Sequence, residues 1–142
     1  MINSRDIEAL YPAVKEKAKE LIELCKKEKI DLIITSTFRD IESQNRLYAQ
    51  GRTLKGKKVT NAKGGQSYHN YRVAFDVVPV VAGKAVWSNN KLWKKIGGLG
   101  MSIGLEWGGS WQSIHDLPHF QYTQGLTLAD FQTGKAKGVF YA

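Results

Sequence analysis

The stretch Gln66-Ser-Tyr-His-Asn-Tyr-Arg-Val-Ala-Phe-Asp76 places a histidine ahead of an aspartate that sits inside an apolar run. From residue 72 to residue 78 the apolar side chains alternate as they do in a β-strand. Val73, Phe75 and Val77 would face one side of it, and Ala74 and Asp76 the other. We therefore predict a strand with one side in the core and with Asp76 pointing into a cleft.

His69, Asp76 and His119 are candidate ligands of one metal ion. Residues 119–122 alternate as a second short strand, which would bring His119 close to Asp76 if the two strands were neighbours. Zinc accepts imidazole nitrogen and carboxylate oxygen at about 2.0–2.2 Å, and a catalytic zinc keeps three protein ligands and one open position. Two histidines and one aspartate suit such a site, although their spacing matches no fixed motif of the H-E-x-x-H kind.

Asp116 and Arg39 are candidates for the chemistry beside that metal. Asp116 lies three residues before His119, and Pro118 between them favours a fixed turn. A zinc ion lowers the pKa of bound water toward about 7, and a nearby carboxylate can take the proton. Arg39 follows a predicted buried strand, 31–37, and can hold a substrate carboxylate or a developing oxyanion.

The length and composition are those of one globular domain, which we assign to residues 1–142. Hydrophobic residues make up 42% of the chain and charged residues 24%. No run approaches the ~20 apolar residues of a membrane span, and the first residues form no signal-peptide core. We therefore expect a monomer that is made in the cytoplasm and does not insert into membranes. The single cysteine, Cys25, falls on the apolar side of a predicted helix and is assigned to the core.

The net charge of +8 favours an anionic partner, either nucleic acid or a polyanionic surface such as a bacterial wall. No recognised nucleic-acid-binding motif accompanies the lysines, so we expect no nucleic-acid partner.

The remaining elements are predicted from periodicity and capping residues. We expect helices over 4–27, over 41–50 and from Asn89 or Asn90 through Ile96, a long loop over 52–66, a hairpin over 80–87, and a short helix from Thr127 through Phe131. Ser4 is the expected cap of the first helix, and Pro12 ends a first short turn or kinks that helix. Glycines 97, 98 and 100 weaken the third helix. We expect Trp107 and Trp111 to line a substrate groove and His115 to be a loop residue.

Several motifs resemble peptidase family M15, in particular its L-alanyl-D-glutamate peptidases from phage endolysins and bacterial autolysins. They cover most of residues 31–122 and are Thr37-Phe-Arg-Asp40, Gln44 with Leu47-Tyr-Ala-Gln-Gly-Arg-Thr53, Ser67-Tyr-His-Asn-Tyr71, Ala74-Phe-Asp76, Gly104-Leu-Glu-Trp-Gly-Gly109, Trp111 and Asp116-Leu-Pro-His-Phe120. The resemblance implies an α+β, hedgehog/D,D-peptidase-like fold, in which helices pack on a small antiparallel sheet.

The same resemblance implies site roles. It implies that His69, Asp76 and His119 bind Zn²⁺, that Asp116 is the general base, that Arg39 holds substrate or stabilises the tetrahedral intermediate, and that Ser67 contacts substrate or supports the metal site. Arg72 is a departure, because the family often has glycine there. Since arginine tolerates positive φ poorly, we expect this change to affect substrate fit more than metal binding.

The implied activity is zinc-dependent cleavage of the L-Ala–D-Glu bond in the peptidoglycan stem peptide. The enzyme would reach the wall through holin-type release or non-classical export. Two alternatives stay open. One is a D,D-carboxypeptidase or dipeptidase of the same family, and the other is a non-catalytic module that binds a polyanion or the cell wall.

Overall fold

The computed structural model describes residues 1–112 and 115–140, which form a sheet, a helical layer and a smaller lobe. The strands are β1 (Asp31–Ser36), β2 (Ala74–Val81), β3 (Lys84–Ala85), β4 (Glu106–Trp107) and β5 (His119–Gln121). The α-helices are α1 (Pro12–Lys27), α2 (Ile41–Ala49), α3 (Asn90–Ser102), α4 (Leu128–Gln132) and α5 (Lys137–Phe140), and the 3-10 helices are η1 (Ile7–Ala9), η2 (Tyr68–Tyr71) and η3 (Gly108–Ser110).

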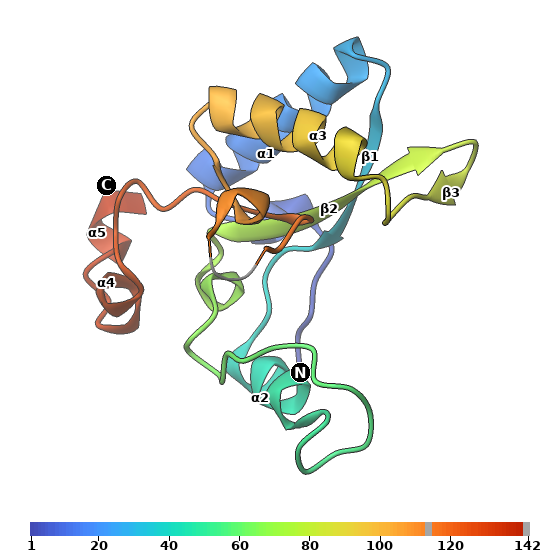
Figure 1. Cartoon of the computed structure of the whole chain (residues 1–142). Helices are drawn as coiled ribbons and strands as arrows, with labels where there is room; N and C mark the ends of the chain where they lie inside the picture. The colour runs from blue at the N-terminus through green and yellow to red at the C-terminus, as the bar shows by residue number, and fades with distance from the viewer. Residues whose placement is uncertain (113–114, 141–142) are drawn as a thin grey trace.

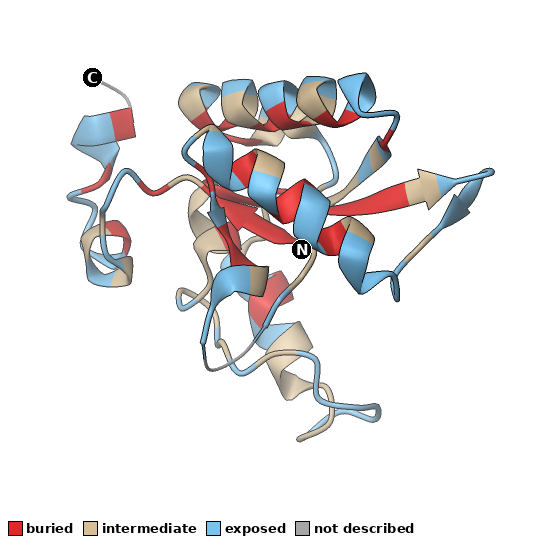
Figure 2. Cartoon of the chain, turned by 45° about the horizontal axis from the view of Figure 1, so that its top comes forward, coloured by how far each residue is buried: buried red, intermediate tan, exposed pale blue. Residues whose placement is uncertain are grey.

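The sheet is antiparallel, with strand order β1-β2-β5-β4 and with β3 paired to β2 as a hairpin. Helices α1 and α3 lie together over one face of it (Figure 1). Many of the buried residues lie between this helical layer and the sheet, and others lie in α2 and in the C-terminal helices (Figure 2). Val73, Phe75 and Val77 are fully buried, so the predicted inward face of the strand is confirmed. The predicted α+β architecture, a small antiparallel sheet with packed helices, is also confirmed.

The pairing of β2 with β5 places the two predicted site strands side by side. In this register Asp76 lies directly opposite His119, and Phe75 lies opposite Phe120. The two phenyl rings stack with centroids 5.8 Å apart on the core side. Because side chains alternate along a strand, the pair of residue 76 and His119 emerges together on the other side. The predicted approach of His119 to Asp76 is therefore confirmed.

The first helix begins later than we predicted. Helix α1 starts at Pro12, which occupies the first helical turn, where its missing N–H and fixed φ are favourable. A separate 3-10 turn, η1, precedes it and is capped by Asp6. The prediction that Ser4 caps the helix is wrong, because the Ser4 backbone instead bonds to Thr37 and Phe38 beyond the end of β1.

Helix α3 runs through all three glycines that were expected to weaken it. A Cβ atom at Gly97 would clash with the Trp107 ring, and one at Gly100 would clash with the Phe120 ring. The missing side chains let the helix approach the sheet closely enough to bury both rings. The packing gained in this way outweighs the poor helix propensity of glycine.

A lobe formed by residues 41–66, which we call the α2 lobe, projects from the sheet away from α1 and α3 (Figure 1). It contains α2 and the long loop predicted after it. Arg52 fixes the loop, because its guanidinium stacks 3.8 Å from the Tyr48 ring and donates to the carbonyl oxygens of Tyr48 and Thr60. Gln44 adds a bond from its Nε2 to the Ala62 carbonyl oxygen at 2.8 Å. The loop is therefore an ordered wall attached to α2.

Cys25 is buried on α1, as predicted, and burial raises the pKa of its thiol to about 11. Within residues 1–112 and 115–140, no helix combines the length and the apolar character needed to cross a membrane.

Candidate active site

Three side chains converge at the point where β2, β5 and η2 meet. The candidate donor atoms of His69, Asp76 and His119 all lie within 4.8 Å of one another. Asp76 Oδ1 is 3.2 Å from His69 Nε2 and 3.2 Å from His119 Nδ1. Both imidazoles are almost fully buried, which fixes their ring orientations. The three residues predicted from the sequence are therefore brought together by the fold.

The hydrogen bonds behind the imidazoles decide which nitrogens face the centre. His69 Nδ1 donates to the Thr37 carbonyl oxygen at 2.8 Å, which leaves the Nε2 lone pair directed at Asp76. His119 Nε2 donates to Gln121 Oε1 at 2.7 Å, which leaves its Nδ1 lone pair directed at the same carboxylate. With neutral rings, three lone pairs point at one centre, an arrangement that a bound cation satisfies. Partners of this kind orient histidine ligands in metal sites, so the residues fit a metal ion.

Without a metal ion, the close approach of the three side chains shifts the pKa values of Asp76 and His119. Burial raises the pKa of Asp76, but the charge of His69 and hydrogen bonds from His119 and His69 outweigh it, so this pKa lies below its usual value. For His119, burial lowers the pKa, while the hydrogen bond and charge of Asp76 raise it above its usual value. A metal-free site therefore favours a proton where a metal would bind.

Arg39 lies at the edge of this centre with its side chain fixed from behind. Its two terminal nitrogens donate to Gln44 Oε1 at 2.9 Å and to Ser36 Oγ at 3.2 Å. The Arg39 Nε is buried and, among the described residues, has no partner. Burial lowers the pKa of Arg39, whereas the charges of Asp76 and Asp116 raise it. A guanidinium held in this way can receive an anion from the cleft.

Asp116 lies beside the centre but outside the ligand set. Its Oδ2 is 4.0 Å from His119 Nδ1, and its side chain is 48% exposed. Desolvation and the charge of Asp76 raise the pKa of Asp116, while His119 and Arg39 oppose this shift. A backbone bond from Asp116 N to the Gly108 carbonyl oxygen at 3.1 Å fixes the segment. This position suits a group that exchanges a proton with a molecule in the cleft.

A cleft gives access to these groups. It has a volume of about 470 Å³ at the centre and includes Arg39, Ser67, Trp111 and Asp116 in its wall. It continues into a cavity of about 780 Å³ that reaches Lys58 on the α2 lobe. The two cavities share the residues Val59, Thr60, Ala62, Gln66, Trp111 and Asp116. The loop of the α2 lobe therefore forms one side of a continuous groove that passes the candidate centre.

The other predicted site residues divide between the cleft and its support. Trp111 lines the cleft, with its ring 5.3 Å from the His119 ring. Ser67 also lines it and caps η2, because its Oγ accepts a hydrogen bond from the His69 N–H. Trp107, which we expected in the groove, is instead buried beneath it, and its Nε1 donates to the Leu117 carbonyl oxygen. Its ring is needed to fill the gap against α3, so it supports the wall rather than contacting the groove. His115 is an exposed loop residue, as predicted.

Three residues that hold the side chains of the site in place were not predicted from the sequence. Gln121, which holds His119, follows it by two positions in a strand, so period-2 alternation could have placed both side chains on one face. Gln44, which holds Arg39, was quoted as part of a motif but given no role. Thr37 acts through its backbone carbonyl, and no side-chain pattern signals such a contact.

Arg72 adopts the left-handed conformation expected for the glycine that it replaces, with φ 64°. Its guanidinium stacks 3.9 Å from the Phe38 ring and donates to the Ala9 carbonyl oxygen at 2.8 Å. These contacts offset the strain of the backbone, which is about 1–2 kcal/mol for a residue with a Cβ atom. The side chain points toward the N-terminal segment, so the metal ligands keep their places.

Comparison with known proteins agrees with this geometry. A family model described as D-alanyl-D-alanine carboxypeptidase matches residues 60–122. The chain is 39% identical over 121 residues to the peptidoglycan L-alanyl-D-glutamate endopeptidase CwlK of Bacillus subtilis, and the alignment covers 79% of this chain and 72% of CwlK.

Solved structures show the same fold. The L-Ala D-Glu endopeptidase ChiX of Serratia marcescens superimposes with a TM-score of 0.61 at 21% identity, over 92% of each chain. A mutant of the vancomycin-resistance D,D-pentapeptidase VanY, in complex with Zn(II), superimposes with a TM-score of 0.62 at 14% identity, over 94% of this chain and 79% of that one. The level of identity to CwlK, on this shared fold, shows that the chain belongs to the metallopeptidase family M15.

Proposed function

We propose that this protein is a zinc-dependent peptidoglycan endopeptidase that hydrolyses the L-Ala–D-Glu bond of the stem peptide. The observation that carries the proposal is the convergence of His69, Asp76 and His119, with Asp116 and Arg39 at the same centre. The identity to CwlK, whose name states this bond, supports the choice of substrate.

His69, Asp76 and His119 would hold the zinc ion, with Thr37 and Gln121 keeping the two imidazoles in the required tautomers. Zinc in such a site polarises a carbonyl group and makes water a better nucleophile. The set of two imidazoles and one carboxylate matches the donors that zinc prefers, and it leaves an open position for a reactant.

Asp116 takes the proton from the attacking water and passes it to the leaving amine. Its position outside the ligand set and its exposure to the cleft allow both transfers. Arg39, which lines the cleft at this centre, faces the developing negative charge of the carbonyl oxygen or a carboxylate of the substrate. Ser67 and Trp111 line the groove through which the peptide passes.

The shape of the groove favours an endopeptidase over the D,D-carboxypeptidase alternative. An endopeptidase needs room for substrate on both sides of the scissile bond, whereas a carboxypeptidase needs only a closed pocket for the last residue. Here the central cavity continues past Asp116 along the α2 lobe toward Lys58. The family model that matches residues 60–122 is named for a D-alanyl-D-alanine carboxypeptidase, so this activity is the second candidate function.

The test is to incubate the purified protein with defined peptidoglycan, with and without a chelator, and to identify the new termini by mass spectrometry. We expect zinc-dependent release of a new D-Glu amino terminus. Release of D-alanine would assign the protein to the carboxypeptidase branch. If zinc-loaded, folded protein cleaved nothing, the proposed activity would be refuted and a wall-binding role would be favoured.

A further inference from the structure

The positive charge of the chain is concentrated in one segment. Between Ser43 and Phe75 the sequence has seven Arg and Lys residues and no Asp or Glu. The rest of the chain has 14 Arg and Lys residues against 13 Asp and Glu residues, so it is nearly neutral. Most of this segment is the α2 lobe, which projects from the body of the protein (Figure 1). Nearly all of the net positive charge therefore lies between Ser43 and Phe75.

Five of these cations lie on the surface. They are Arg46, Lys55, Lys57, Lys58 and Lys63, and all are exposed. One of them, Lys63, also has its Nζ 5.4 Å from the centroid of the Tyr48 ring. In the part of the chain that the structure describes, none of the five forms an ion pair with a carboxylate. Three of the five lysines of α1 differ, because Lys15, Lys17 and Lys19 each pair with a glutamate. The other two cations of the segment, Arg52 and Arg72, hold the fold.

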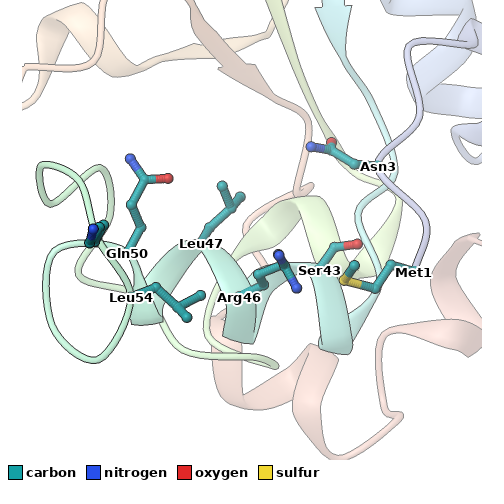
Figure 3. A pocket seen from close by; sticks show the side chains of 8 residues that line it. Met1, Asn3, Ser43, Arg46, Leu47, Gln50 and Leu54 are labelled. Carbon is teal, nitrogen blue, oxygen red and sulfur yellow. The ribbon is translucent and has the colours of Figure 1, made fainter.

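The lobe also has a second pocket, which shares only Leu47 with the lining of the central cleft. Its volume is about 450 Å³, and its lining includes Arg46 and Lys55 but no acidic residue. Figure 3 shows Ser43, Arg46 and Leu47 of α2 between Gln50 and Leu54 on one side and Met1 and Asn3 on the other. Leu47 lines both this pocket and the catalytic groove. A ligand in the pocket would thus lie next to the groove without entering it.

We infer that the α2 lobe is a docking surface for a phosphodiester-linked anionic polymer of the cell wall, with the pocket of Arg46 and Lys55 as its seat. Several unpaired cations on one surface fit a polymer with repeated charges better than a ligand with one charge. A guanidinium binds phosphate through paired hydrogen bonds, and lysines beside it add charge. The lining of the pocket includes none of the residues of the candidate metal centre, so a ligand seated there lies outside that centre. The loop is already fixed to α2, which lowers the ordering cost of binding.

The inference rests on the proposed function in one respect, namely that the protein acts at the wall. Its role would be to hold the enzyme at its substrate, as a separate wall-binding domain would. Attraction of this kind is screened by salt, with a Debye length of about 8 Å at 0.15 M.

The test compares two triple variants with equal loss of charge. The lobe variant is Arg46→Gln, Lys55→Gln and Lys57→Gln, and the control variant is Lys26→Gln, Lys84→Gln and Lys137→Gln. Lys58 is left unchanged because it lines the groove. Binding is measured by sedimentation with sacculi that retain their phosphodiester polymers and with sacculi stripped by hydrofluoric acid. Each variant also carries Asp116→Ala so that the sacculi remain intact.

We expect the lobe variant to bind unstripped sacculi about tenfold more weakly or worse, because cations near an anionic surface add to affinity individually. The control variant should stay within about threefold, and the two should bind stripped sacculi equally. An equal loss in both variants would overturn the inference, since only total charge would then matter. Binding by the unsubstituted lobe that survives stripping would also overturn it, as would tighter binding to duplex DNA than to unstripped sacculi.

Turnover of a soluble stem peptide, measured with Asp116 intact, separates this inference from the proposed function. We expect both triple variants to retain the activity of the parent protein on that peptide. If the parent did not cleave it but the lobe variant still lost sacculus binding, the proposed function would fail while the docking surface stood.

Discussion

Gln121 allows a direct test of the metal site, because its side chain accepts the hydrogen bond that orients the candidate ligand His119. The change Gln121→Leu keeps most of the side-chain volume but removes the acceptor of the His119 Nε2–H bond, which is 2.7 Å long. Gln121→Glu is the matched control, since its carboxylate retains an acceptor. Gln121 and His119 are both buried, so water does not readily replace the lost hydrogen-bond partner.

Two independent magnitudes apply to Gln121→Leu. Loss of such a partner of a metal-bound histidine weakens metal affinity about 10–100-fold, which corresponds to roughly 1.4–2.7 kcal/mol. A buried donor left without an acceptor costs about 1–3 kcal/mol. Losses of this size are expected if the bond to His119 Nε2 sets the tautomer that metal binding needs.

The assay is zinc affinity by competition with a chromophoric chelator, with circular dichroism to confirm that each variant is folded. We expect Gln121→Leu to fall within the range of loss given above and Gln121→Glu to stay within about threefold of the parent protein. The reasoning would be refuted if folded Gln121→Leu bound zinc as tightly as the parent, or if both variants lost affinity equally.

Four further predictions test the site and its scaffold. Asp116→Ala should abolish peptide hydrolysis while elemental analysis finds zinc content unchanged, and loss of metal would mean that Asp116 is a ligand. Gly97→Ala should destabilise the protein by about 1–3 kcal/mol in urea unfolding, because the added Cβ meets a buried indole ring. Gly98→Ala has open space around its Cβ and should stabilise the protein by about 0.5–1 kcal/mol. Similar changes in stability for both variants would contradict the packing argument. Arg72→Gly should be more stable than Arg72→Ala by about 1 kcal/mol, because both lose the same contacts and only glycine relieves the positive φ; the usual order, with alanine more stable, would contradict it. The raised folded pKa of His119 means that metal-free protein is fully stabilised by this group below its unfolded pKa of about 6.5 and loses that stability as the pH rises through the folded pKa. Zinc needs the neutral imidazole, so melting temperatures with zinc and with chelator should diverge as the pH rises through this window, and parallel curves would count against His119 as a ligand.

Strands β2 and β5, which carry Asp76 and His119, were predictable because apolar side chains alternate along them. Alternation at Val73, Phe75 and Val77 placed Asp76 on the opposite face, and the short strand of His119 suggested its neighbour. Both statements need only the period of a strand and an apolar core. The pairing of these strands explains why the convergence of the candidate ligands Asp76 and His119 could be predicted from the sequence.

The remaining features depend on tertiary contacts that local patterns do not contain. The glycines at 97 and 100 indicate a weak helix until the Trp107 and Phe120 rings are known to lie against them. Trp107 itself was assigned to the groove because an indole suits either a groove or a core, and only the close approach of α3 decides between them. The lysines of the α2 lobe are evident in the sequence, but the sequence does not show that this lobe projects from the rest of the protein.

The strand order also has a consequence for synthesis of the protein. Strand β5 is the last of the five to leave the ribosome, yet it lies between β2 and β4, which are made before it. Until it inserts, β4 has no partner in the sheet and the site lacks both His119 and its supporting glutamine. A growing chain therefore cannot assemble the hydrolytic centre until translation has passed β5, a case of non-local contacts that delay folding. Fragments that end before β5 would therefore lack His119 and are expected to be inert.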